Sequence, residues 1–128
     1  MTNEAFAPFQ HLAADLLKHL PADHSDSSHD LSHIHRVWVN AQRIQHVEGG
    51  DLEVLLAAVL LHDCVAVEKN SPLRGQASTL SAQKATSILA DMGWPTQRID
   101  QVAHAVKTHS YSAGIEPFTL EARILQDS

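Results

Sequence analysis

One stretch of the sequence is apolar on every side of a helical wheel. From Val54 to Leu61 the segment 51–63 contains only Val, Leu and Ala, so a helix formed there has no face suited to water. Such a helix must be covered by neighbours all round, and the pattern therefore predicts a central helix. The apolar run then changes abruptly to the adjacent pair His62 and Asp63, two groups that are costly to bury unless they are paired or bound to a metal ion.

Apolar periodicity and stop signals predict five further helices. The segment 4–20 carries one apolar stripe, which is typical of a helix that covers the core from one side. The other four predicted helices cover 29–47, 78–92, the residues from Thr96 to just before His109, and 120–126. Residues that can cap or open helices stand at their starts: Asp51, Ser78 or Thr79, Thr96, and Pro117 with Thr119. No stretch alternates with period two, so we expect an all-α, single-domain bundle of about six helices spanning 1–128.

Composition narrows the classes of function. The chain has 128 residues, is 44% hydrophobic and carries a formal net charge of -6, which leaves no basic field for a polymeric nucleic acid. No run reaches the length of a membrane span, and the amino terminus lacks the layout of a signal peptide. The lone Cys64 excludes an intrachain disulfide and is expected to be a small core residue. We therefore expect a cytoplasmic protein that binds neither membranes nor DNA or RNA polymers.

Histidine is the unusual residue type, with ten copies. Adjacent helical residues point about 100° apart, so His62 and Asp63 can reach one ion only near a helix end, which is where they lie. An isolated His-Asp pair is, however, more often an ordinary hydrogen-bonded pair. His29 and His33 are four residues apart and can share one helical face, but a zinc protease would need glutamate in the position after His29. His35 is expected on a solvated face.

Four short motifs follow one another in a fixed order. They are His-Asp-x-x-His-x-x-Arg-Val around His33, Leu-Leu-His-Asp ending at Asp63, His-x4-His-Ser around His109, and Ile-Leu-Gln-Asp ending at Asp127. In residue type, order and spacing this pattern resembles the HD-domain superfamily of metal-dependent phosphohydrolases, and within it the small bacterial HD hydrolases. The resemblance extends from about residue 29 to the last residue and includes a Lys-Asn-x-Pro loop at 69–72.

The resemblance implies an all-helical domain whose metal-site core covers 29–127. It implies one divalent ion, Mn, Mg, Ni, Co, Fe or Zn, with a ligand set of His33, His62, Asp63 and Asp127. Some members of the superfamily bind more metals through additional histidines, and His109 stands where such a ligand falls. Ser78 occupies roughly the place of another histidine in the binuclear pattern, so one metal is expected.

The implied activity is hydrolysis of a phosphomonoester or nucleotide by water that the metal activates. Glu68 is a candidate general acid or base, and His109 is a second candidate catalytic residue. Lys69 is a candidate for contact with the phosphate, together with Arg36, Arg74 and Lys107. Each of these side chains also suits an ordinary solvated position. His104 suits a pocket wall or a core hydrogen bond as well as a catalytic role.

A second interpretation comes from the end of the chain. In the relatives the distal aspartate is followed by an Ala-Asp-Arg-Leu-Asp type continuation and further helices, whereas here one residue follows Asp127. The alternative is therefore a degenerate, truncated HD module that binds a nucleotide or a protein partner. Trp38 and Trp94 are expected to be core or interface anchors, and a homodimer is the simplest cover for apolar surface. A third interpretation, an HD-type oxygenase with two irons, needs more ligands than the sequence offers.

Overall fold

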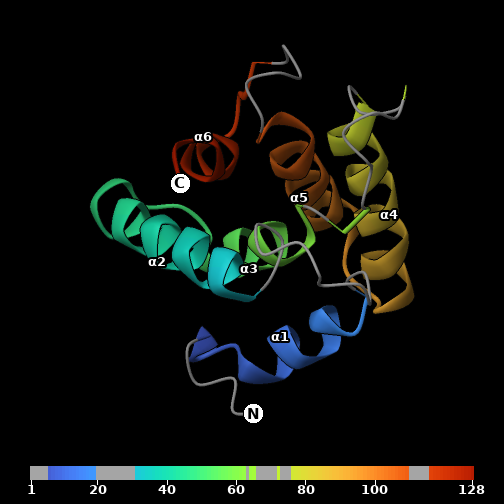
Figure 1. Cartoon of the computed structure of the whole chain (residues 1–128), viewed down its shortest axis with the longest axis horizontal. Helices are drawn as coiled ribbons and strands as arrows, with labels where there is room; N and C mark the ends of the chain where they lie inside the picture. Colours follow the sequence, from blue (N-terminus) through green and yellow to red (C-terminus); the bar gives the residue numbers. More distant parts are fainter. Residues whose placement is uncertain (1–5, 20–30, 63, 66–71, 73–75, 110–115) are drawn as a thin grey trace.

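The protein is all-α, as the hydrophobic pattern predicts. The computed structural model describes residues 6–19, 31–62, 64–65, 72, 76–109 and 116–128, and among these it contains helices and no strand. The helices are α1 (Gln10–Leu17), α2 (Leu31–Glu48), α3 (Leu52–Leu61), α4 (Ala77–Asp91), α5 (Thr96–Thr108) and α6 (Leu120–Asp127), shown in Figure 1. Within this described part of the chain, no helix combines the length and apolarity needed to cross a membrane.

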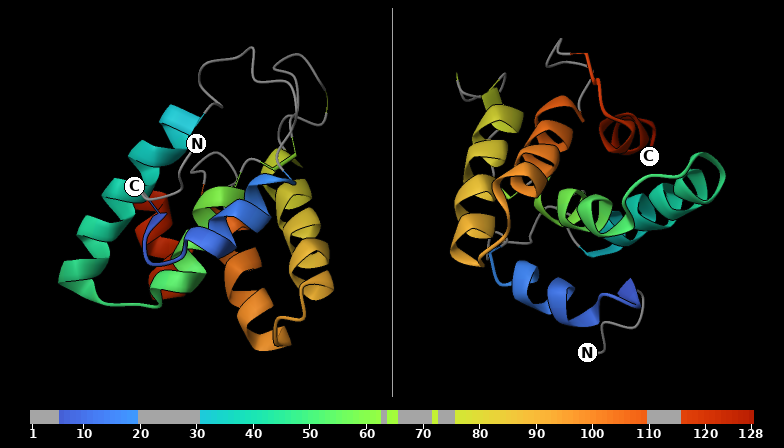
Figure 2. Two further views of the ribbon diagram at one scale, coloured as in Figure 1. Left: turned by 90° about the horizontal axis from the view of Figure 1, so that it is seen from below. Right: turned by 180° about the vertical axis from the view of Figure 1, so that it is seen from behind.

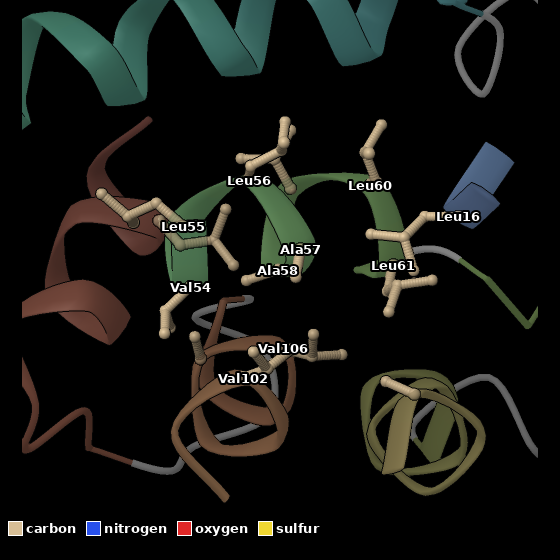
Figure 3. Packing of buried hydrophobic residues seen from close by; sticks show 14 of the residues in the cluster. Leu16, Val54, Leu55, Leu56, Ala57, Ala58, Leu60, Leu61, Val102 and Val106 are labelled. Atoms are coloured by element: carbon tan, nitrogen blue, oxygen red, sulfur yellow. The ribbon is translucent and has the colours of Figure 1, made fainter. Parts of the chain in front are cut away.

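The central helix is α3. Residues 54–61 are each at most 1% exposed, and α3 contacts all five of the other helices. Figure 3 shows Leu16 of α1 beside the end of α3, and Val102 and Val106 of α5 beneath its alanines. Full burial of one aliphatic side chain contributes about 1.5–3 kcal/mol, so this apolar cylinder is the main source of stability in the bundle. The sequence-based prediction of a helix covered on all sides is confirmed.

The beginning of α3 is held by hydrogen bonds from three directions. Asp51 is its N-cap, and Oδ1 accepts from the backbone N–H groups of Glu53 at 3.0 Å and Val54 at 3.2 Å. The guanidinium of Arg98 on α5 pairs with Asp51 at 3.2 Å and with Glu53 at 2.6 Å. Glu121 on α6 accepts from the N–H of Asp51 at 3.1 Å. These contacts tie the start of α3 to α5 and α6, so the direction of α3 relative to both helices is defined.

The N-terminal helix is shorter than the predicted span of 4–20. Residues 1–5 and 20 lie outside the described residues, but α1 begins only at Gln10, after a turn in which the N–H of Phe9 donates to the carbonyl of Phe6 at 2.8 Å. Pro8 explains the late start, because proline has no N–H and disfavours helical geometry in the residue before it. Phe6 is nonetheless fully buried, and its ring lies 6.5 Å from that of the equally buried Trp38. The prediction that Trp38 is a core anchor is therefore confirmed.

Two of the expected helix caps are wrong. The α4 helix begins at Ala77, so Ser78 and Thr79 lie inside its first turn. The α5 helix begins at Thr96 itself, and Pro95 is the N-cap, with its carbonyl accepting two backbone N–H groups at 3.0 Å. In both cases the preceding residue takes the cap position, and its backbone starts the helix without a capping side chain.

The cap of α3 gives the first testable prediction. Asp51→Ala removes both capping bonds and the pairing with Arg98, and we expect it to lower the free energy of unfolding by about 1 kcal/mol or more. Asp51→Asn keeps an oxygen that can accept the capping N–H groups. It loses only a partly exposed ion pair, which contributes roughly 0–1 kcal/mol. Urea unfolding followed by circular dichroism measures both variants, and equal destabilisation would contradict the assignment of Asp51 as the cap.

Candidate functional site

His62 is held at the end of α3 by the helix that it terminates. It is the C-cap of α3, and its side chain is buried. Nδ1 lies 2.5 Å from the carbonyl oxygen of Val59. Because a carbonyl oxygen can only accept, Nδ1 carries the proton, and in the neutral ring the lone pair is on Nε2. This is the arrangement of a metal-ligating histidine, whose second nitrogen donates to a carbonyl or carboxylate.

Two further imidazoles lie beside the His62 ring. His33, near the start of α2, has its ring centroid 5.6 Å from that of His62. His109, the C-cap of α5, has its ring 4.9 Å away on an edge-to-face geometry. The Nδ1 atom of His109 lies 2.6 Å from the carbonyl oxygen of Val106, which repeats the arrangement at the end of α3. Three helices thus bring together histidines that are 29 and 47 positions apart in the sequence.

The end of α6 lies against α5 and α2. The amide of Gln126 donates to the carbonyl of Thr108, the residue before the C-cap histidine of α5, at 2.9 Å. Asn40 on α2 donates to the carbonyl of Ser128 at 3.1 Å. Both views of Figure 2 show α6 between α2 and α5. Asp127 therefore sits between two residues that are anchored to the helices carrying His109 and His33.

The described residues supply part of the predicted metal-binding set. Asp63 lies outside the described residues, and so do Glu68 and Lys69. Among the residues that are described, no group of three or more His, Cys, Asp or Glu side chains is arranged to hold an ion. The donor chemistry nevertheless fits a divalent ion, since neutral imidazoles oriented by backbone carbonyls are common metal ligands. The four-residue ligand set stays a prediction.

His104 is hydrogen-bonded to the segment that precedes α6. Its Nε2 accepts a hydrogen bond from the backbone N–H of Phe118 at 3.1 Å, and the two rings are 3.8 Å apart. Burial, and secondly the positive charge of Lys107, lower the pKa of His104 below 6.5. A neutral ring is what the hydrogen bond requires, because a protonated Nε2 cannot accept. The sequence left open a pocket wall, a hydrogen bond or a catalytic role for His104, and the structure shows a hydrogen bond.

His35 does not lie on a solvated face. It is partly buried, and its ring centroid is 5.1 Å from that of Phe6. Phe6 reaches this position from the turn before α1, which periodicity within α2 gives no means to predict. His35 therefore contacts Phe6, whereas His33 on the same helix contacts His62.

Two residues of α4 hold the chain just after α3, and nothing in the sequence singles them out. The hydroxyl of Ser81 accepts from the N–H of Val65 at 3.1 Å, and the carbonyl of Ser81 accepts from Sγ of Cys64 at 3.4 Å. The ammonium of Lys84 donates to the carbonyl of Cys64 at 3.2 Å. Cys64 is buried, as its small apolar character predicts. A serine and a lysine inside a helix usually face water, so neither residue type signals a bond to a distant turn.

Comparison with known proteins agrees with the motif pattern. The family model of the HD domain matches residues 30–128, and the chain belongs to the HD-domain family. A crystal structure of a predicted HD superfamily hydrolase from an uncultured Thermotogales bacterium is similar, with a TM-score of 0.72 and 30% sequence identity. The match covers 94% of this chain and 66% of that one. A search of curated proteins found no match.

The expected family is therefore confirmed. Membership supports the expectation that this is a protein of a hydrolase family. HD domains generally bind divalent metals.

The His104 contact predicts a pH-dependent contribution to stability. Because the folded-state pKa lies below the unfolded value of 6.5, this contribution is fully present above that pH and is lost as pH falls through the lowered pKa. We expect the difference in Tm between the wild type and His104→Ala to shrink as the pH is lowered from about 8 to about 5. Lys107→Gln removes a charge that lowers this pKa, so it should move the loss to higher pH. A difference in Tm that does not vary with pH would contradict the assignment.

Proposed function

We propose that this protein hydrolyses a phosphomonoester or a nucleotide with one divalent ion, bound by His33, His62, Asp63 and Asp127. One observation carries the proposal: the buried His62 ring is held in the tautomer of a metal ligand, beside two other imidazoles, in a chain of the HD-domain family. An imidazole buried for packing alone has no need of two imidazole neighbours. The ligand identities are those that the resemblance to the HD-domain family implies, and the contact between His33 and His62 supports two of them.

The backbone prepares these rings for their roles. The carbonyls of Val59 and Val106 hold the Nδ1 protons of His62 and His109, so the lone pair of each neutral ring is on Nε2. When bound, the ion lowers the pKa of water toward about 7 and offsets negative charge on the phosphoryl oxygens. His109, beside His62, accepts the proton of the attacking water at Nε2.

A phosphate needs local positive charge in a protein with a net charge of -6. Arg36 is exposed and lies three residues after His33 on α2, so the two side chains share one side of the helix. We propose Arg36 as a phosphate contact. Lys107 is also exposed, but its charge lowers the pKa of His104, the residue that accepts a hydrogen bond from Phe118. Lys69 and Arg74, the other two basic candidates, lie outside the described residues.

Metal content tests the ligand set. After chelation and reconstitution with Mn, Mg, Ni, Co, Fe or Zn, we expect about one equivalent of ion in the wild type and its loss in His33→Ala, His62→Ala and Asp127→Ala. His35→Ala is the matched control, because His35 is on α2 like His33, but its imidazole lies against Phe6 instead of His62. Elemental analysis of the purified proteins gives the result. Equal retention of the ion in His35→Ala and His62→Ala would overturn the assignment.

Turnover tests the role of His109. With the ion bound, we expect hydrolysis of phosphomonoesters in a substrate panel that includes nucleotides. His109→Ala should lower kcat by about 100-fold or more, the usual effect of removing a general base, while the ion is retained. Release of inorganic phosphate measures the rate, and His35→Ala is again the control. A protein that retains the ion and binds nucleotides but hydrolyses none of them would support the alternative, a binding module.

A further inference from the structure

The chain that leaves α3 is attached to α4 by hydrogen bonds from Ser81 and Lys84. The side chains contribute two of them: the Ser81 hydroxyl accepts from the N–H of Val65, and the Lys84 ammonium donates to the carbonyl of Cys64. A third bond runs from the Cys64 thiol to the Ser81 carbonyl. Ser81 is 1% exposed, so its hydroxyl is a buried polar group whose position is set by this contact. We call Ser81 and Lys84 the α4 clamp.

The α4 clamp acts on the turn that contains His62. The N–H of Cys64 donates to the carbonyl of Leu61 at 3.1 Å, so Cys64 is bonded back to the last residue of α3. Holding Cys64 therefore fixes the far side of this turn, and the buried end of α3 fixes the near side. The bond from Nδ1 to Val59 then sets the rotation of the ring. Backbone position and ring rotation together define where Nε2 lies.

We propose that Ser81 and Lys84 are positioning residues for His62, which hold its Nε2 in place beside His33 and His109. This inference rests on the proposed function for its catalytic consequence, but the orientation of the ring is measurable without it. Packing alone does not require a serine at position 81. Ala82 and Ala85 on the same helix are buried, so an alanine at position 81 would satisfy the core and lose only the bond to Val65.

The first test reads the ring in the metal-free protein. In histidine labelled with 15N, the shifts of Nδ1 and Nε2 report the tautomer of His62, assigned by comparison with His62→Ala. We expect Ser81→Ala to move both shifts toward an average of the two tautomers, and Ser81→Thr, which keeps the hydroxyl, to preserve the wild-type values. Ser87→Ala is the matched control, because it removes an exposed hydroxyl from the same helix. Unchanged His62 shifts in Ser81→Ala, even with a lower Tm, would overturn the proposal.

The second test uses Lys84 and Mn²⁺. Loss of a residue that orients a ligand commonly weakens metal binding by 10- to 100-fold, so we expect about a 10-fold higher Kd in Lys84→Met and recovery in Lys84→Arg. Isothermal titration with Mn²⁺ measures both variants, and a Kd unchanged in Lys84→Met would contradict the role of the lysine. A wild type that binds no ion would overturn the proposed function alone, since the nitrogen shifts of His62 still decide the inference about the α4 clamp.

Discussion

The burial of α3 on every side is the constraint on which the rest of the structure depends. A helix without a polar face can exist in water only if other helices enclose it, and here five helices contact it. The start of α3 is held by contacts among Asp51, Arg98 and Glu121, so its far end reaches a defined point inside the bundle. His62 stands at that point. The apolar run is therefore responsible for stability and also for the position of the imidazole.

The ends of α3 and α5 combine two roles in one hydrogen bond. The last four carbonyls of a helix have no N–H partner within the helix, and a nearby histidine can bond to them. His62 bonds to Val59 in this way, and His109 bonds to Val106. The same bond that satisfies a helix end also places the ring proton on Nδ1 and the lone pair on Nε2. A ligand-type tautomer thus arises from helix capping and needs no additional carboxylate at these two positions.

Most of the fold could be predicted from local pattern, and the site only in part. The central helix, the cap at Asp51 and the order of the helices follow from residues close in sequence. The late start of α1 follows from Pro8, a local signal that the apolar stripe obscured. The contact of His35 with Phe6 and the bonds of Ser81 depend on how distant segments meet, which periodicity does not contain. The proximity of His33, His62 and His109 has the same origin. The end of the apolar run pointed to His62 and helical spacing to His33, but only the resemblance to a family joined them with His109 in one site.

The distribution of the proposed ligands over three helices links metal binding to the fold: His33 lies on α2, His62 at the end of α3 and Asp127 on α6. An ion bound by α2, α3 and α6 together stabilises their packing, because binding to the folded state alone adds free energy to it. The α6 helix has eight residues and is too short to be stable by itself, so its tertiary contacts maintain it. The residues on either side of Asp127 make two tertiary hydrogen bonds: Gln126 donates to the carbonyl of Thr108, and the carbonyl of Ser128 accepts from Asn40. The ability of Asp127 to complete a metal site therefore depends on the hydrogen bonds of its neighbours as much as on its own carboxylate.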